Sequence, residues 1–444
     1  MSRPPTNTPA PPGALAARLR RSRAALGAVL GLGIALLALL PASCGRAPGT
    51  VAEGGAIRFW NGFTGPDGAT MERMTKRFTA ETGIPVRMQI IPWATYYDKL
   101  TLSLAYGDAP DLFVCHANRI AEFARYQVFA PIAPLLAADP SFDVDDIIPR
   151  VRSAATYCGT QVALPLDCHP QGLYYNARLF REAGIVDAGG RAAPPRTLDE
   201  FLAAARRLTR DEDGDGQPEQ WGFAFTWLRT NWITFLSQFG AGILTPDLSR
   251  AALAEPPALE ATRLMRDLIY RYRVAPKPEG IDAWMGFRQG RVAMAIEGIY
   301  MISSLQTQPG LSYAGAPVPR FGPNPGVWGG SHMLCLPRDL PAERQARAWR
   351  LMRYLSDHSL DWAAGGQVPV RRSLLRTARF RRMTVQYQFS HQLPYVVFEP
   401  PSPKSNEVTP FVDSAIQAVL LGIQSPRAAA ADASRRINQV LERP

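Results

Sequence analysis

Apolar residues recur along the chain with two different periods, and the period distinguishes predicted strands from predicted helices. A short apolar run at 57–60 predicts a strand, and apolar residues at helical spacing then predict a helix that Gly83 can end. Further elements follow in the same alternation, with predicted strands at 86–91 and 111–115 and a predicted helix at 97–106. Alternating strands and helices are typical of an α/β fold.

The middle of the chain, from Thr197 to about Tyr272, is predicted to be rich in helices. Thr197, with Glu200 three residues later, forms a capping box, which marks the start of a helix. Aromatic residues crowd the segment 221–239, and the tail at 411–441 again has helical spacing. The sequence contains no internal repeat.

The chain has 444 residues, which is enough for two domains that each bury an apolar core. Its 46% apolar and 20% charged residues are typical of a soluble globular protein. The formal charge of +11 would favour a nucleic-acid partner if the basic residues formed one large patch. Instead, arginines concentrate in the first 23 residues and the others are scattered among acids, so no nucleic acid is expected.

The N-terminal segment carries the clearest local signal. Arg18–Arg23 is positively charged, 24–40 is an uninterrupted apolar run, and small residues stand directly before Cys44. This order resembles a bacterial lipoprotein signal, which implies that 1–44 is a signal segment and that Cys44 is lipidated. A plain secretory signal and an uncleaved membrane helix are the alternatives. All three place the body of the chain outside the cytoplasm, and the lipoprotein reading anchors it to the membrane.

Export makes disulfides permissible, and Cys115, Cys158, Cys168 and Cys335 follow Cys44. The sequence does not determine their pairing, although Cys158 and Cys168 lie on either side of a predicted strand and are candidates for a bridge. Buried free thiols are the alternative. Neither the cysteines nor the histidines have the spacing of metal ligands, so no metal site is predicted from them.

One acidic loop leaves calcium binding open. The run Asp211-Glu212-Asp213-Gly214-Asp215-Gly216 has the alternating acids and the glycine of a calcium loop, with Glu219 at the ninth position. The twelfth position is Gly222, where such a loop needs a bidentate glutamate. A solvated turn is the alternative.

An ordered series of short motifs runs through nearly the whole chain after Cys44. In order they are Ile57-Arg58-Phe59-Trp60-Asn61-Gly62, Phe78 with Thr82-Gly83-Ile84-Pro85-Val86, Trp93 with Tyr96-Tyr97-Asp98-Lys99-Leu100, Gly107-Asp108-Ala109-Pro110-Asp111, Leu164-Pro165-Leu166-Asp167, Gly172-Leu173-Tyr174-Tyr175-Asn176, Phe180-Arg181-Glu182-Ala183-Gly184, Pro195-Arg196-Thr197 with Glu200-Phe201, Phe287-Arg288-Gln289-Gly290-Arg291-Val292-Ala293-Met294, Gly329-Gly330-Ser331, and Gly365-Gly366 with Pro369. Together they resemble the extracellular solute-binding proteins of ABC sugar importers, the family of the maltose, trehalose and glycerol-3-phosphate receptors.

This resemblance implies a type II periplasmic-binding-protein fold, in which two α/β lobes, each a sheet flanked by helices, close over a solute by bending at a hinge. The first lobe would hold 52–165 and about 320–365, and the second would hold 166–319 and about 366–444. Crossings between the lobes are expected near Pro165, Pro319 and Gly366 because these are turn-forming residues. The resemblance also implies a monomer that needs no cofactor and delivers a sugar to the permease subunits of an ABC importer.

A sugar presents hydroxyl groups at its edge and apolar C–H faces, so its receptor needs hydrogen-bonding groups and aromatic rings. Ligands of sheets built this way lie beyond the carboxyl ends of the strands. That rule favours Asn61 and Thr64 after the first predicted strand. It also favours His116, Asn118 and Arg119 after the third.

The resemblance adds two positions to these. Tyr300 stands where maltose-type receptors carry a stacking aromatic residue, and His169 stands where they carry a glutamate. The other candidate binding residues are Phe63, Asp167, Trp227, Arg229, Trp232, Gly330 and Arg371. A purely structural role, such as capping a turn or filling the core, is the alternative for each candidate.

Two other functions stay open at this point. A glycerol-3-phosphate or glycerophosphodiester receptor of the same fold would need arginines such as Arg119, Arg229 and Arg371 to converge on a phosphate. A secreted glycoside-acting enzyme would need two carboxylates, for which Asp167 and Glu297 are the candidates. The chain has no G-x-S-x-G, HExxH, P-loop or GxGxxG motif, so a binding protein is predicted and not an enzyme.

Overall fold

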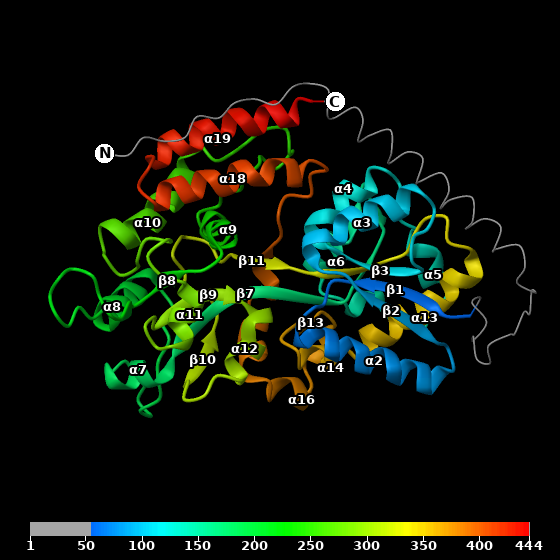
Figure 1. Cartoon of the computed structure of the whole chain (residues 1–444), viewed down its shortest axis with the longest axis horizontal. Coiled ribbons are helices and arrows are strands. Elements are labelled where there is room, and N and C mark those ends of the chain that lie inside the picture. The colour runs from blue at the N-terminus through cyan, green and yellow to red at the C-terminus, as the bar shows by residue number, and fades with distance from the viewer. Residues whose placement is uncertain (1–54, 444) are drawn as a thin grey trace, which may run out of the picture. The chain divides into compact units, whose positions relative to one another are not determined.

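The computed structural model describes residues 55–443, in which helices cover two larger β-sheets (Figure 1). The smaller of the two has five strands in the order β2-β1-β3-β12-β6. These strands are β1 (Ile57–Asn61), β2 (Val86–Ile90), β3 (Leu112–His116), β6 (Leu164–Pro165) and β12 (His332–Cys335). β1 runs parallel to β2 and β3, whereas β12 runs antiparallel to β3 and β6. The predicted α/β alternation of the first part of the chain is confirmed.

The larger sheet is built around one long strand, β7 (Asp167–Asn176), in which every residue is buried. The strand order is β14-β11-β7-β9-β8, and β10 and β13 also pair with β7. The partners are β8 (Ala224–Phe225), β9 (Met294–Gly298), β10 (Tyr313–Ala316), β11 (Val327–Gly330), β13 (Val368–Pro369) and β14 (Val396–Val397). A separate hairpin joins β4 (Thr156–Tyr157) and β5 (Thr160–Gln161).

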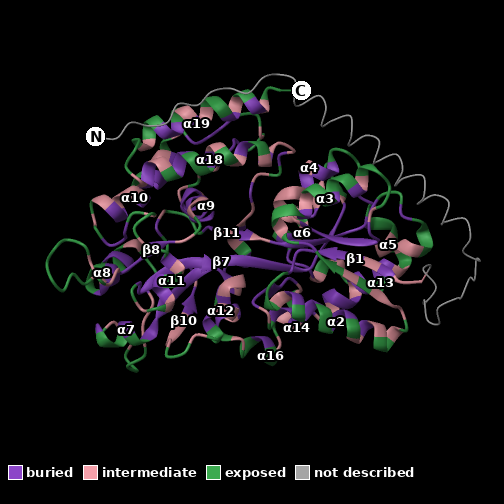
Figure 2. Cartoon of the chain, viewed as in Figure 1, coloured by how far each residue is buried: buried purple, intermediate pink, exposed green. Residues whose placement is uncertain are grey.

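Helices lie on both sheets with their buried faces inward and their exposed faces outward (Figure 2). Those in the first part of the chain are α2 (Pro66–Thr82), α3 (Trp93–Ala105), η2 (Ala117–Arg119), α4 (Ile120–Ala124), α5 (Ala133–Ala138), η3 (Val144–Asp146), α6 (Pro149–Ala154), α7 (Ala177–Glu182), α8 (Leu198–Leu208), α9 (Leu228–Gln238), α10 (Pro256–Tyr270) and α11 (Ala283–Arg288). The rest are η4 (Ile299–Met301), α12 (Ile302–Gln306), α13 (Ala342–Asp357), α14 (Ser359–Ala363), α15 (Arg372–Leu375), α16 (Ala378–Arg381), α17 (Thr384–Ser390), η5 (Leu393–Tyr395), α18 (Ser405–Leu420) and α19 (Pro426–Leu441).

Local sequence signals explain where several helices begin and end. α2 has a proline in its first turn and ends at Gly83, whose φ of 71° is the left-handed conformation that glycine adopts without strain. At α8 the Thr197 hydroxyl accepts from the Glu200 backbone N–H at 3.3 Å, as the capping box predicts. The Glu200 carboxylate, however, accepts from the backbone N–H of Arg196 and not from that of Thr197.

The chain passes between the two sheets at two adjacent places. Leu166 alone separates β6 from β7, and Ser331 alone separates β11 from β12. The Leu166 backbone N–H donates to the His332 carbonyl at 2.9 Å, and the Ser331 hydroxyl donates to the Asp167 carbonyl at 2.5 Å. The two passages therefore run side by side. The second passage was predicted near Pro319, but it lies at Ser331. β11, which follows Pro319 along the chain, pairs with β7 and so still belongs to the larger sheet.

A third passage leads from α14, which packs on α2, to β13, which pairs with β7. It contains Gly366, whose φ of 112° is accessible to glycine. A Cβ at Gly366 would also lie 3.0 Å from the carbonyl oxygen of Ile299. The position of this predicted crossing therefore requires glycine for both conformation and space.

The predictions about the cysteines and the N-terminal segment have mixed outcomes. Cys115, Cys158, Cys168 and Cys335 are all free, so the candidate bridge between Cys158 and Cys168 is absent from the described residues. The predicted lipidation residue Cys44 and its signal segment lie outside the described residues. Among residues 55–443, no helix combines the length and the apolar character needed to cross a bilayer.

The packing on β7 yields a first testable prediction. A Cβ added at Gly172 would lie 2.1 Å from the Phe389 ring of α17, so Gly172→Ala forces this buried ring to move. Overpacking of this kind costs about 1–3 kcal/mol, and we expect a lower urea midpoint of unfolding. Gly55→Ala is the control, because no atom lies within 4 Å of its added Cβ. Equal midpoints for the two variants would contradict the packing seen here.

Candidate ligand-binding site

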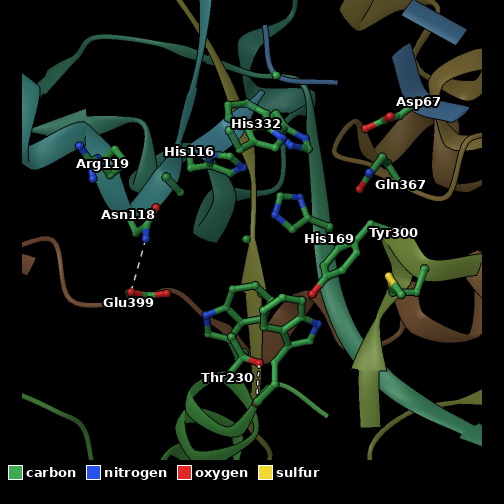
Figure 3. Close-up of a pocket in the computed structure, with 18 of the residues that line it drawn as sticks. Asp67, His116, Asn118, Arg119, His169, Thr230, Tyr300, His332, Gln367 and Glu399 are labelled. Atoms are coloured by element: carbon green, nitrogen blue, oxygen red, sulfur yellow. Dashed lines mark hydrogen bonds between the residues drawn. The ribbon is translucent and has the colours of Figure 1, made fainter. Parts of the chain in front are cut away.

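A cavity of about 650 Å³ lies between the loops of the two sheets (Figure 3). The smaller sheet contributes the loops after β1 and β3 together with the first turns of α2 and α3. The larger sheet contributes β7, β11 and the first turns of α9 and η4. Its lining residues are Gly62, Thr64, Gly65, Pro66, Asp67, Trp93, Tyr97, His116, Ala117, Asn118, Arg119, His169, Trp227, Arg229, Thr230, Tyr300, Met301, Ser303, Trp328, Gly329, Gly330, His332, Gly365, Gln367, Phe398, Glu399 and Asn406.

Aromatic rings reach the cavity from both sheets. Trp93 and Tyr97 come from α3, whereas Trp227, Tyr300 and Trp328 come from the larger sheet and its helices. Trp227 is 58% exposed, although a side chain of this size is ordinarily buried. Exposed rings on a cavity wall are suited to contact with an apolar face of a ligand.

Three rings of the cavity lie directly against glycines. A Cβ at Gly62 would come within 2.2 Å of Trp93, and one at Gly298 would come within 2.1 Å of Tyr300. A Cβ at Gly330 would lie 2.0 Å from Nε2 of His169. None of these glycines has a positive φ, so it is space and not backbone conformation that requires glycine there.

Three imidazole rings form one wall of the cavity, as Figure 3 shows. The ring centroids of His169 and His332 are 4.6 Å apart, and that of His116 is 5.0 Å from that of His332. Nδ1 of His116 lies 2.6 Å from the Tyr97 hydroxyl, which also accepts the backbone N–H of His116. Burial, together with the neighbouring rings of His332 and His169, holds the pKa of His116 well below its usual range.

Asp167 lies behind this wall and is fully buried. Its Oδ1 is 3.2 Å from Nδ1 of His169 and accepts the His332 backbone N–H at 3.0 Å. Its Oδ2 is 2.7 Å from Nδ1 of His332 and accepts the indole N–H of Trp362 at 2.6 Å. Burial by itself would raise the pKa of Asp167. The interactions with His332 and His169 outweigh burial and hold this pKa far below its usual range.

Asp167, His169 and His332 are also residue types that can bind a metal ion, and their ligand atoms lie within 4.8 Å of one another. Both oxygens of the carboxylate, however, are already fully engaged by donors from the protein. The contacts therefore describe a hydrogen-bonded network. The exposed carboxylates of Asp211, Asp213 and Asp215 also cluster, but they accept backbone N–H groups of their own loop, as a solvated turn does.

Hydrogen-bonding groups without protein partners also line the cavity. Gln367 is 2% exposed, and its Oε1 has no hydrogen-bond partner in the protein. The same is true of the buried indole N–H of Trp328. Both atoms are buried beneath the cavity surface, and leaving such a group unpaired costs about 1–3 kcal/mol.

Both arginines of the cavity wall are paired with carboxylates. The guanidinium of Arg119 lies 3.0 Å from Glu122, and that of Arg229 lies 3.1 Å from Asp413 and 3.9 Å from Glu399. Asn118 also donates to Glu399 at 3.4 Å, across the left side of Figure 3. Neither arginine of the wall is left with an unbalanced charge.

A buried glutamate lies beneath Tyr300. Glu297, at the end of β9, is 1% exposed, and its Oε1 accepts the Gly298 backbone N–H at 2.7 Å. Burial raises the pKa of Glu297 to about 7. The hydrogen bond from Gly298 and that from Thr226 oppose this shift only in part.

Most of the residues predicted from the sequence come together around the cavity. Those that line it are Thr64, His116, Asn118, Arg119, His169, Trp227, Arg229, Tyr300 and Gly330. Thr64, His116, Asn118 and Arg119 follow β1 and β3, which is where the strand-end rule placed them.

Three of the other predicted residues lie just below the cavity surface. Asn61 is 0% exposed, and its Oδ1 accepts the Phe63 backbone N–H at 3.1 Å, so it shapes the loop after β1. Phe63 packs in the core against Trp362, with ring centroids 4.7 Å apart. Asp167 supports His169 and His332 from behind, as described above. Each of these side chains reaches the cavity only through another residue.

Trp232 and Arg371 lie elsewhere. Trp232 is 1% exposed and donates its indole N–H to Thr262 at 2.9 Å, as a core residue does. Arg371 pairs with Asp146 at 2.9 Å and also with Asp357, and none of these residues lines the cavity.

Several lining residues were not predicted from the sequence. They are Asp67, Tyr97, Gln367, His332 and Glu399. Two of them carried a usable signal, because Tyr97 belongs to the quoted Tyr96-Tyr97-Asp98 motif and His332 directly follows Gly329-Gly330-Ser331. The other three stand in segments whose position depends on tertiary packing alone.

Two sheets joined by short crossings, with a polar and aromatic cavity between them, define a two-lobed solute-binding protein. The chain belongs to the family of bacterial extracellular solute-binding proteins, whose model matches residues 63–359. The fold is the predicted type II periplasmic-binding-protein fold, with sheets flanked by helices. Members of this family bind solutes and are not enzymes.

Relatives and solved structures agree with this assignment. A binding protein of Brucella abortus (strain 2308) is 25% identical over 428 residues, which cover 93% of this chain and 97% of the relative. The maltotriose-binding protein of Pyrococcus abyssi is 23% identical over 72% of this chain and 68% of its own length. A solute-binding protein of an ABC transporter from Thermotoga lettingae, solved with α-D-tagatose, has a TM-score of 0.73. It is 27% identical, and the match covers 87% of this chain and 100% of that one.

The raised pKa of Glu297 yields a prediction about stability and pH. Below pH 4.5 this side chain is neutral in both the folded and the unfolded chain, so it causes no penalty. Between its ordinary value of 4.5 and about 7, only the unfolded chain ionises. The stability that Glu297 contributes is therefore lost as pH rises through this window, by about 3 kcal/mol.

We expect Glu297→Gln to remove that loss, so that the free energy of unfolding of the variant minus that of the parent chain increases from pH 4.5 to pH 8. Urea unfolding at a series of pH values measures this difference. Glu343→Gln, whose parent side chain is 85% exposed, is the control and is expected to give a flat difference. A flat difference for Glu297→Gln as well would show that this carboxyl titrates normally.

Proposed function

We propose that this protein is the extracytoplasmic receptor of an ABC importer and that it captures a mono- or oligosaccharide in the cavity between its two sheets. The observation that carries this proposal is the composition of the cavity. Aromatic rings such as Trp227 and Tyr300 face the same space as uncharged or charge-balanced hydrogen-bonding groups. A neutral ligand with apolar faces and a hydroxylated edge matches both features.

The size of the cavity and the known relatives support the same proposal. A volume of about 650 Å³ lies within the range of pockets for small molecules, roughly 300–1,000 Å³. The Pyrococcus abyssi relative is named for maltotriose, and the Thermotoga lettingae structure holds α-D-tagatose. A sugar of one to a few rings is therefore the proposed ligand class.

The contacts of the arginines favour a sugar over glycerol 3-phosphate. A phosphate site needs guanidinium groups free to form charge-assisted hydrogen bonds. Arg119 and Arg229 are paired with carboxylates at the cavity wall, and Arg371 is paired away from it. A phosphate would therefore have to compete with carboxylates that are already in place.

The contacts of the two candidate catalytic carboxylates do not favour a glycoside-acting enzyme. Asp167 is 0% exposed and Glu297 is 1% exposed, and neither lines the cavity. Glycoside hydrolysis needs carboxyl groups that touch the substrate from its two sides. The buried positions of both residues support a binding role for the site.

Membrane anchoring and partners complete the proposal. Lipidation at Cys44 would keep the receptor at the membrane, close to the permease subunits that receive the sugar. Closure of the lobes over a bound sugar would stabilise the form that docks on the permease. The proposed working unit is a monomer.

Thermal melting of the purified chain with a panel of compounds tests the function. The panel holds maltose, maltotriose, D-tagatose, glycerol 3-phosphate and spermidine. A ligand that binds only the folded state stabilises it by about 2.7 kcal/mol at one hundred times its Kd, so a sugar that binds should raise Tm by a few degrees. A rise with glycerol 3-phosphate alone would move the proposal to the phosphate receptor, and no rise with any sugar would contradict it.

The aromatic wall yields a prediction for whichever sugar of the panel raises Tm. Trp227→Ala removes an exposed ring from the wall, and we expect affinity to fall by about 1 kcal/mol or more. Tyr106→Ala is the matched control, because Tyr106 is 83% exposed and lies outside the cavity. Titration calorimetry should show a several-fold weaker Kd for the first variant and an unchanged Kd for the second. Equal affinities would remove Trp227 from the binding surface.

A further inference from the structure

The network behind the imidazole wall determines which ring nitrogens carry hydrogen. An ionised carboxylate only accepts hydrogen bonds. Asp167 faces Nδ1 of both His169 and His332, at 3.2 Å and 2.7 Å, so each of these nitrogens has to carry a hydrogen. A neutral imidazole carries one hydrogen, which leaves Nε2 of each ring with a free lone pair.

Both rings are buried and lie close together. His169 is 5% and His332 is 6% exposed, and their centroids are only 4.6 Å apart. Two positive charges at this distance inside a protein repel strongly. Burial also lowers the pKa of His169 below its usual value. The charged groups around the rings are Asp167 itself and the Arg119 guanidinium, and the neighbouring titratable group is the His116 ring, whose pKa burial lowers.

Both histidines line the cavity, whereas Asp167 does not. The carboxylate therefore holds the Nδ1 edges from behind the cavity wall. Nε2 of His169 lies close to the backbone of Gly330, where an added Cβ would be 2.0 Å away. Because residue 330 is glycine, no side chain at this position displaces the ring.

From this geometry, and resting on the proposed sugar-binding function, we propose that Asp167 is a positioning residue that holds His169 and His332 in the Nδ1–H tautomer. Their two Nε2 atoms then form a hydrogen-bond acceptor wall. This wall recognises neighbouring hydroxyl donors of the ligand. Groups that only accept hydrogen bonds, such as a phosphate or a carboxylate, find no donor there. Asp167 thereby selects the chemical class of the ligand without touching it.

The first test needs no sugar. Long-range ¹H–¹⁵N NMR spectra of the unliganded chain at pH 7.5 report which nitrogen of each histidine is protonated, and single His→Gln variants assign the signals. We expect the Nδ1–H pattern for His169 and His332. In free histidine the Nε2–H tautomer predominates, so this pattern is distinctive. An Nε2–H or doubly protonated ring at either position would overturn the proposal.

Asp167→Asn tests the cause. Asparagine presents one acceptor and one donor, so one of the two Nδ1 atoms then faces an N–H group and has to accept. We expect one ring to change to the Nε2–H tautomer. Asp111→Asn is the matched control, because Asp111 is also a buried aspartate but lies outside the cavity and pairs with Arg344. It should leave both tautomers as they are, whereas unchanged tautomers in Asp167→Asn would overturn the role of Asp167.

Titrations with maltotriose and D-tagatose connect the tautomers to recognition. For a sugar that binds the parent chain, we expect Asp167→Asn to weaken Kd roughly tenfold or more, because a donor then meets a donor. Gly330→Ala should weaken Kd as well, since its Cβ would lie 2.0 Å from Nε2 of His169 and forces this ring to move. Full affinity in Asp167→Asn with a changed tautomer would overturn the proposal. Binding of neither sugar, with both Nδ1–H tautomers seen, supports the tautomer assignment and counts against the proposed function alone.

Discussion

The arrangement of the two sheets depends on the buried carboxylate of Asp167. A charge buried this deeply is tolerated only where hydrogen-bond donors surround it, because desolvation costs several kcal/mol. The donors come from His332 at the start of β12, from Trp362 in α14 and from His169 on the same strand. His332 directly follows the passage at Ser331, and Trp362 lies shortly before the passage at Gly366. Asp167 itself directly follows the passage at Leu166. One side chain thus ties together all three connections between the sheets, and none of them can shift without leaving this charge unpaired.

The cavity lies directly in front of this junction, and the same constraint shapes its walls. Three rings of the cavity, those of Trp93, Tyr300 and His169, lie directly on the backbone. They leave no room for a side chain below them, which is why glycine stands there. The backbone therefore supports the rings directly, so the binding surface is set by the strands and not by mobile side chains. Glu297 lies beneath Tyr300 and is buried as well, and its burial favours the uncharged form.

The sequence predicts the parts of this structure that local rules govern. Apolar spacing, Gly83 and Thr197 locate strands and helices within a few residues, and the strand-end rule finds Thr64 and His116. Non-local packing limits the rest. Asn61 and Trp232 have the residue types of a sugar site, but the loop after β1 and the contact with Thr262 bury them. Glu399 and Gln367 reach the cavity from segments far along the chain that no periodicity connects to it. The lobe boundaries and the role of each lining residue stay predictions.

Electrostatics decides between ligand classes where shape does not. A basic chain with arginines at a cavity would ordinarily favour an anionic ligand. Here Glu122, Glu399 and Asp413 balance those arginines, and Asp167 sits behind the imidazoles. An anion entering the cavity would lose its hydration and would meet guanidinium groups already shared with carboxylates, so the desolvation cost would exceed the gain. A neutral polyol loses less hydration on entering the same cavity. Charge balance among the side chains therefore converts a basic protein into a receptor suited to uncharged solutes.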